Sequence, residues 1–189
     1  NIAYSFNAAG YRVRDDDTTV DFNRTAILFA GESIMAGYGL NWAESIPAQT
    51  ASMLRVQPAN IAVNGYASDQ IYLRLKQELP RFRRPVAVVV LFTPMLFRRN
   101  LDDDRPHLGP GLVWQSPVER WRLSALARRL VPYRGEAEIR CGVMTTRELL
   151  RASVDLAHAR GAAAVIVVPQ FLPETPAERL VREAVLGGS

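Results

Sequence analysis

The stretch Thr25-Ala-Ile-Leu-Phe-Ala-Gly-Glu-Ser33 decides the fold of this chain, because an apolar run leads directly into a glycine and a serine. A short continuous apolar run is typical of a strand that is buried on both faces, as in a parallel sheet. In open parallel sheets, ligands bind beyond the carboxyl ends of the strands. The stretch therefore predicts a strand over 25–30 that presents the hydroxyl of Ser33 at such an end.

Three further apolar runs predict the other strands, and helical patterns separate them. The predicted strands cover 61–63, 86–92 and 162–168, and the predicted helices cover 69–79, 116–130, 145–160 and 175–186. Proline or a capping box marks the start of the last three helices. Because strands that alternate with helices indicate βαβ units, we expect a three-layer, doubly wound α/β fold with a mostly parallel, flavodoxin-like sheet.

The chain divides into a lead-in and one domain. Residues 1–24 are polar and predict an irregular lead-in, whereas 25–189 form one α/β domain. The stretch from 98 to 144 is too long for one crossover, so it predicts an inserted loop and helix after the third strand. The final helix should lead into a last strand, so we expect the domain to be incomplete at its C-terminus.

Composition excludes several classes of protein. No run approaches the roughly 18 to 20 apolar residues that span a bilayer. The single cysteine, Cys141, excludes an internal disulfide and any zinc site that needs two cysteines, and we expect no metal or organic cofactor. The formal charge of +4 comes almost wholly from arginines that are spread along the chain, unlike the basic face of a nucleic-acid binder. We therefore expect no nucleic-acid partner.

Ser33 fits an acyl-transfer site better than it fits rival motifs. A serine that ends a strand and begins a helix offers both a hydroxyl and a backbone N–H for an oxyanion. The nucleophile elbow G-x-S-x-G is excluded because Met35 stands in its last glycine position. A phosphate-binding loop would need a lysine here, and there is none. Taken alone, the serine is equally compatible with a simple helix cap.

Two blocks of sequence resemble those of the SGNH (GDSL-like) hydrolases. Residues 26–39 resemble the first block, with Glu32 in place of the usual Asp, and residues 62–70 resemble the second. The resemblance implies that Ser33 is the nucleophile and that the N–H groups of Ser33 and Gly65 form the oxyanion hole. The lead-in Tyr4-Ser-Phe-Asn-Ala-Ala-Gly-Tyr-Arg12 resembles a segment of exported or membrane-tethered members, which implies a membrane tether outside this chain.

The chain departs from the family pattern in two places. Met95 falls near the position of the family's oxyanion-hole Asn and has no N–H to donate, so Asn100 is the candidate third donor if its loop folds back. No D-x-x-H block follows a fifth strand, and we expect that block to lie beyond residue 189. The substitute within the chain is His107, three residues after Asp104, acting as the base with Asp104 orienting it.

Several residues near the same sheet edge are candidates for substrate binding. Arg98, Arg99 and Arg105 would bind an anionic group, and the aromatic residues Tyr38, Trp42 and Tyr66 could line a substrate cleft. Surface solvation is the more ordinary explanation for the arginines.

Two functions follow from these residues. The first is a serine hydrolase or O-acyl transferase that acts on a small acyl ester, for example acetyl on a carbohydrate. The second is a non-catalytic SGNH-like binding module, which Met95 and the missing D-x-x-H block would favour.

Overall fold

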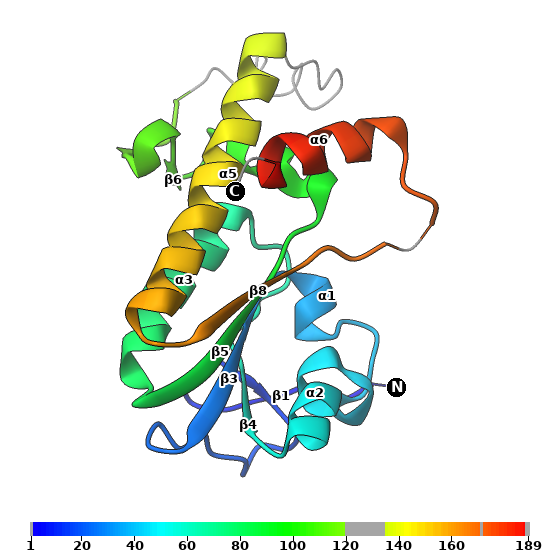
Figure 1. Cartoon of the computed structure of the whole chain (residues 1–189), viewed down its shortest axis with the longest axis vertical. Helices are drawn as coiled ribbons and strands as arrows, with labels where there is room; N and C mark the ends of the chain where they lie inside the picture. Colours follow the sequence, from blue (N-terminus) through cyan, green and yellow to red (C-terminus); the bar gives the residue numbers. More distant parts are fainter. Residues whose placement is uncertain (1, 120–134, 171, 188–189) are drawn as a thin grey trace.

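A six-stranded, mostly parallel sheet forms the centre of the molecule (Figure 1). The computed structural model describes residues 2–119, 135–170 and 172–187. In sheet order the strands are β1 (Ser5–Phe6), β2 (Arg12–Val13), β4 (Gln57–Asn60), β3 (Thr25–Ala30), β5 (Arg84–Leu91) and β8 (Ala163–Val167). The four strands from β4 to β8 are parallel, whereas β1 and β2 add to one edge in antiparallel fashion. The prediction of a doubly wound, flavodoxin-like sheet is confirmed, because these four strands have the order second, first, third, fourth.

Helices cover both faces of the sheet. The α-helices are α1 (Ser33–Ala36), α2 (Ile46–Leu54), α3 (Ser68–Glu78), α5 (Glu136–Ala159) and α6 (Pro176–Leu186). Figure 1 shows α3 and α5 on one face and α1 and α2 on the other. The described residues also form four 3₁₀ helices and a small second sheet: η1 (Trp42–Glu44), η2 (Leu79–Arg81), η3 (Pro94–Leu101), η4 (Pro110–Leu112), β6 (His107–Leu108) and β7 (Trp114–Gln115).

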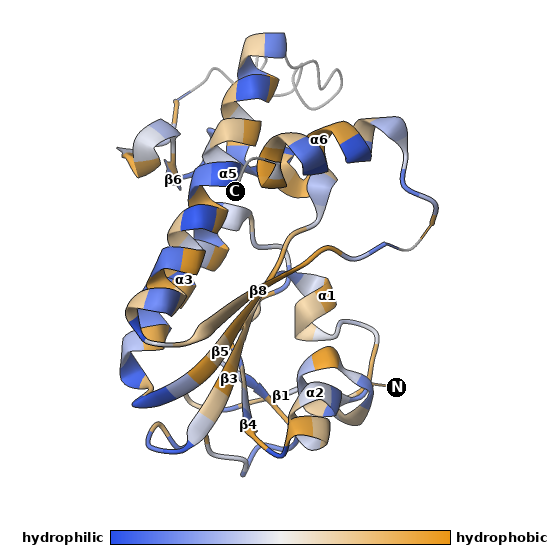
Figure 2. Cartoon of the chain, viewed as in Figure 1, coloured by the Kyte–Doolittle hydropathy of each residue, from blue (hydrophilic) through white to orange (hydrophobic). Residues whose placement is uncertain are grey.

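The position of strand β3 between two cores explains why its sequence is continuously apolar. Leu28 packs into the larger core below α3 and α5, whereas Ile27 and Phe29 pack into a smaller core with Met35 of α1. Successive side chains of a strand point to opposite faces, so a strand that is covered on both sides needs apolar residues at every position. Figure 2 shows this hydrophobic centre between helices with mixed surfaces.

The predicted strands agree with the structure except at the second. The strands expected over 25–30, 86–92 and 162–168 are confirmed within two residues. The second strand lies over Gln57–Asn60 rather than 61–63. Gln57 and Pro58 interrupt the apolar pattern there, so the segment gave no strand signal. The predicted stretch still continues the ladder, since Ile61 N donates to Phe29 O at 3.0 Å.

The predicted helices agree at two places and need correction at two others. Helix α3 and helix α6, with its capping box, are confirmed. Helix α5 begins at Glu136, nine residues before the expected cap at Thr145. Inside it, Thr146 Oγ1 donates back to Gly142 O at 2.7 Å. The inserted helix expected over 116–130 is not helical over 116–119, and its remainder lies outside the described residues. The structure also adds α2, which begins at the N-cap Ser45.

The lead-in is structured, contrary to the expectation of irregular chain. Arg12 pairs with Asn60 of β4, and both Tyr11 and Arg12 are fully buried. Strands of two residues are too short to show a periodic pattern, which is why the sequence did not reveal them. The assignment of 25–189 to one incomplete domain stays a prediction. Within the described ranges, no helix combines the length and hydrophobicity that crossing a bilayer would need.

Candidate active site

Ser33 is the first residue of the one-turn helix α1, directly beyond the carboxyl end of β3. Its side chain is partly exposed, and its hydroxyl donates to the Oε2 atom of Glu32. Glu32 is buried, and its Oε1 atom accepts from the N–H of Ile34 at 3.4 Å. Glu32 therefore caps α1 and at the same time holds the hydroxyl of Ser33 in one orientation.

Two glycines set the geometry of this turn. A Cβ on Gly31 would lie 2.6 Å from Cβ of Met35 and 2.9 Å from Cβ of Leu91, so only glycine allows the strand to turn so closely. Gly37 ends α1 in the left-handed region, with a φ of +74°. The first block thus holds Ser33 on a single helical turn with a defined start and end.

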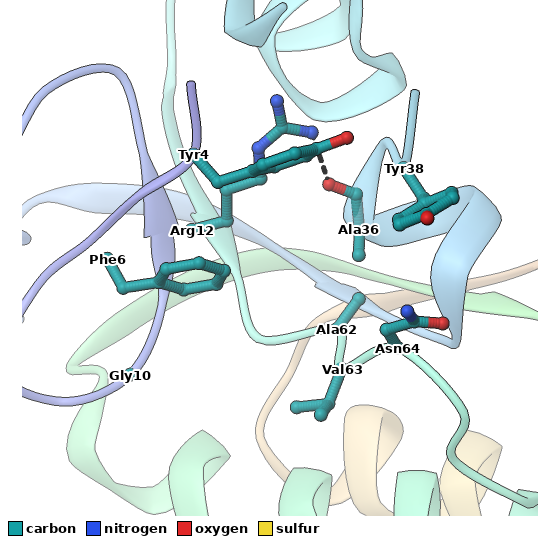
Figure 3. A pocket seen from close by; sticks show the side chains of 9 residues that line it. All are labelled: Tyr4, Phe6, Gly10, Arg12, Ala36, Tyr38, Ala62, Val63 and Asn64. Atoms are coloured by element: carbon teal, nitrogen blue, oxygen red, sulfur yellow. Dashed lines mark hydrogen bonds between the residues drawn. The ribbon is translucent and has the colours of Figure 1, made fainter. Parts of the chain in front are cut away.

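Arg12 of the lead-in fixes the end of this turn. Its Nη1 atom donates to Gly37 O at 2.7 Å and also to Ala36 O, and its Nη2 atom donates to Leu40 O. The Tyr4 ring lies over the guanidinium, 4.7 Å from its carbon (Figure 3). Burial lowers the pKa of Arg12 from its ordinary value. A positive charge at the C-terminal carbonyls of a helix is favourable, so this buried arginine stabilises the loop that carries the serine.

Gly65 lies in a tight turn next to the first block. Tyr66 N donates to Val63 O at 3.3 Å, and Gly65 has a φ of +82°, the geometry that a type II turn requires at its third position. Val63 N donates to Gly31 O at 3.1 Å, so the two blocks are joined directly. Ser33 lies two residues after Gly31, and Gly65 lies two residues after Val63, so both follow closely on the two residues that this bond joins. Gly65 is exposed, and its role in an oxyanion hole stays a prediction.

Asn100 does not join this group. It is buried in η3, and its Nδ2 atom donates to Thr146 Oγ1 of α5 at 2.7 Å. The expectation that Asn100 supplies a third oxyanion donor is therefore not supported, because its N–H is engaged with a helix of the opposite layer. Met95, near the family position, is partly exposed.

Asp104 and His107 do not form a hydrogen-bonded pair. His107 lies in β6, where its Nδ1 atom faces Arg105 O at 3.0 Å, and Asp104 is exposed. Among the described residues, no hydrogen bond or ion pair joins His107 to Asp104 or to Ser33. The interpretation of His107 as a substitute base oriented by Asp104 is wrong for this conformation, since a spacing of three residues in a loop does not bring the side chains together.

Two of the three candidate arginines are structural. Arg105 forms a bidentate ion pair with the buried Asp69 of α3, at 2.8 and 2.9 Å. Arg99 donates from Nη1 to Tyr66 O at 3.3 Å. Both side chains thus fasten the inserted loop to the second block and α3, and their role in binding a substrate stays a prediction. Arg98 is exposed and stays a candidate.

Three hollows lie along this region of the surface. Tyr66 and Arg105 meet in a hollow of about 370 Å³ beside α3, and a second one, of about 330 Å³, lies beyond the ends of β5 and β8. The third, of about 340 Å³, lies against the Ser33 loop (Figure 3). It is lined by Tyr4, Phe6, Gly10, Arg12, Ala36, Tyr38, Ala62, Val63 and Asn64. Sequence reasoning named Tyr38 as a possible cleft residue but missed the contribution of the lead-in, although its aromatic residues Tyr4 and Phe6 pointed to it. In the described part of the chain, no cluster of three potential metal ligands occurs.

The fold, with a serine at the end of its first parallel strand, defines the class of α/β proteins to which the SGNH hydrolases belong. No protein-family model and no curated protein matches the chain. Among solved structures, TesA is 19% identical over 85% of this chain and 72% of its own, with a TM-score of 0.54. A structure described as "a putative lipolytic protein of G-D-S-L family", from Desulfitobacterium hafniense DCB-2, is 16% identical over 86% of this chain and 68% of its own, with a TM-score of 0.50. The chain therefore has the SGNH/GDSL hydrolase fold.

Proposed function

We propose that this protein is a serine hydrolase or O-acyl transferase that acts on a small acyl ester, acetylated carbohydrates included. One observation carries the proposal. The hydroxyl of Ser33 lies at the carboxyl edge of the sheet on a one-turn helix, next to the tight turn of Gly65. This is the edge at which open parallel sheets bind ligands. The structural likeness to TesA and to a G-D-S-L family protein supports the fold on which this proposal rests.

In the proposed reaction, Ser33 Oγ attacks the ester carbonyl carbon while its proton leaves to a base. The N–H groups of Ser33 and Gly65 donate to the oxyanion that forms. The alcohol then departs with a proton, which leaves an acyl group on Ser33. Water or an acceptor alcohol attacks this acyl-enzyme and restores the serine hydroxyl.

Glu32 has a positioning role in this scheme. It is the carboxylate that accepts the hydrogen bond of the Ser33 hydroxyl, and its burial and its bond to the N–H of Ile34 hold it in place. Fixing the nucleophile in one rotamer reduces the entropy that must be lost on reaching the transition state. We assign the proton acceptor to none of the described histidines, because His107 and His158 have no contact with Ser33 in the described structure.

Ester turnover tests the proposal. The chain should hydrolyse p-nitrophenyl butyrate, and Ser33→Ala should abolish that hydrolysis. Ser68→Ala is the matched control, because Ser68 is also the first residue of a helix, α3. It should keep wild-type activity. Equal turnover by wild type and Ser33→Ala would reject the assignment of the nucleophile.

A non-catalytic binding module is the second candidate function. It is favoured by Met95 near the place of an oxyanion donor and by the engagement of Asn100 with Thr146. Saturable binding of an ester together with an absence of Ser33-dependent turnover would support it.

A further inference from the structure

The hollow beside the Ser33 loop has the size of a small-molecule site. Its volume of about 340 Å³ falls at the lower end of the roughly 300 to 1,000 Å³ typical of ligand pockets. Its walls come from three separate segments: the lead-in, the end of α1 and the residues before Gly65 (Figure 3). Of the residues predicted from sequence to bind substrate or line its cleft, Tyr38 lines it, whereas Arg98, Arg99, Arg105 and Tyr66 do not.

The hollow adjoins both elements of the proposed reaction centre. Ala36, which lines it, lies three residues after Ser33 on the same face of α1, and such residues have Cβ atoms about 5 to 6 Å apart. Asn64, also in its wall, directly precedes Gly65. The wall of this hollow at Ala36 therefore lies within one helical turn of any group that is attached to Ser33 Oγ.

The walls favour an uncharged, apolar occupant. Phe6, Tyr38 and Val63 present aromatic and aliphatic surface to it. The charged side chain in the wall is Arg12. Its Nη1 and Nη2 atoms already donate to the carbonyls of Ala36, Gly37 and Leu40. The Tyr4 hydroxyl likewise accepts from Gly39 N at 2.6 Å. Ligand recognition here must come from burial of apolar surface rather than from charge.

We propose that this hollow is the pocket for the acyl chain of the substrate, and that the lead-in residues Tyr4 and Phe6 form the wall that sets its length. The orientation of the chain toward Ser33 rests on the proposed function. At roughly 30 Å³ for a group the size of water, the volume holds about ten such groups, so an unbranched acyl chain of about four to eight carbons fits. Among the esters of the proposed function, those of short or medium aliphatic acids should then be preferred over acetate esters.

Binding of uncharged ketones tests the pocket without any need for turnover. Methyl n-alkyl ketones, from 2-butanone to 2-octanone, carry the carbonyl and the chain of the acyl group but cannot be hydrolysed. Their Kd, measured by NMR titration, should fall by up to about fourfold for each added methylene, the value expected for full burial of that group. Equal affinity for 2-butanone and 2-octanone would overturn the proposal.

Two variants and one matched control locate the binding. Phe6→Ala removes a half-exposed wall residue, 54% exposed, and should cut the advantage of 2-octanone over 2-butanone at least threefold. Trp114→Ala removes a side chain with 57% exposure in the hollow beside α3 and should leave that advantage unchanged. Val63→Phe fills the pocket from another wall and should weaken 2-octanone more than 2-butanone. Equal effects of Phe6→Ala and Trp114→Ala would place the ketones elsewhere.

The pocket and the proposed function can fail separately. Ser33→Ala should abolish turnover of p-nitrophenyl esters and leave the ketone series unchanged. Ketone binding that depends on chain length, without Ser33-dependent turnover, would reject the hydrolase and keep the pocket. Turnover that depends on Ser33 but is equal for acetate and hexanoate esters would reject the pocket and keep the hydrolase.

Discussion

Alanine at Gly37 should destabilise the protein much more than alanine at Gly39. Both glycines lie in the loop after Ser33, and both have left-handed backbone, with φ of +74° and +82°. At Gly37 an added Cβ would lie 2.3 Å from Nη1 of Arg12, whereas at Gly39 it would meet no atom within 4 Å. The two positions therefore share the backbone cost. They differ in the displacement of Arg12 and in a tight contact of 3.0 Å between the added Cβ and Cβ of Ser45.

The expected magnitudes follow from these contacts. Placing alanine in left-handed backbone costs about 1 to 2 kcal/mol, so Gly39→Ala should lose about that much unfolding free energy. Gly37→Ala must also move the guanidinium away from the carbonyls of Ala36 and Gly37. A hydrogen bond to a charged group contributes about 1.5 to 3 kcal/mol, so the loss of one such bond or more makes Gly37→Ala about 2 to 4 kcal/mol worse than Gly39→Ala.

Urea denaturation followed by tryptophan fluorescence measures this difference. Both variants should keep the wild-type dependence of the free energy on urea, which shows that they unfold from the same compact state. If Gly37→Ala and Gly39→Ala lose equal free energy within about 1 kcal/mol, Arg12 does not clamp the Ser33 loop and the reasoning is refuted.

Three further predictions concern the residues around this loop and the outer helices. Arg105→Leu leaves a buried carboxylate unpaired and should cost about 3 to 5 kcal/mol of unfolding free energy, whereas Arg98→Leu should stay within about 0.5 kcal/mol of wild type; equal effects in denaturation would argue that Arg105 is not structural. Glu32→Ala should slow fluorophosphonate labelling of Ser33 at least tenfold, because a hydrogen bond to a charged group is lost, and Glu32→Gln, which can still accept that bond, should recover part of the rate; a wild-type rate in Glu32→Ala would remove its positioning role. Thr175→Ala removes the capping box of α6 and should cost about 1 kcal/mol, and an unchanged melting temperature would show that this helix does not depend on its cap.

The strands were predictable where burial on both faces leaves a continuous apolar run. Thr25–Ala30 is such a case, because its alternate residues enter two different cores. Gln57–Asn60 is the opposite case, since it occupies an inner position of the sheet with two polar residues and a proline. Its place in the sheet depends on partners on both sides rather than on its own composition.

Helix starts show the same division between local and distant causes. The capping box at Thr175 is a local arrangement, and it forms as the spacing predicts. The identical spacing at Thr145 lies inside α5, because the helix continues to Glu136 and packs there against η3, where Thr146 bonds to Asn100 and Gly142 lies against Leu101. Tertiary packing outweighs a cap that is worth about 1 kcal/mol.

At the site, sequence placed the residues that the strand ends carry and misplaced those that depend on distant partners. Ser33 and the turn of Gly65 follow from strand ends and glycine positions, which are local features. Arg105 binds a carboxylate 36 residues earlier, and Asn100 binds a hydroxyl 46 residues later. The spacing of residues within one segment cannot predict partners that are so far away in the sequence. The role of Arg12 as a clamp was invisible for the same reason.

The central claim is that Ser33 is a reactive nucleophile, and the most direct measurement is to locate a fluorophosphonate adduct by peptide mass spectrometry. Trypsin releases Ser33 in the peptide 25–55, where fragment ions separate it from the other serines. The account predicts one adduct, on Ser33, that disappears in Ser33→Ala. An adduct on another residue, or no adduct on the folded protein, would contradict it.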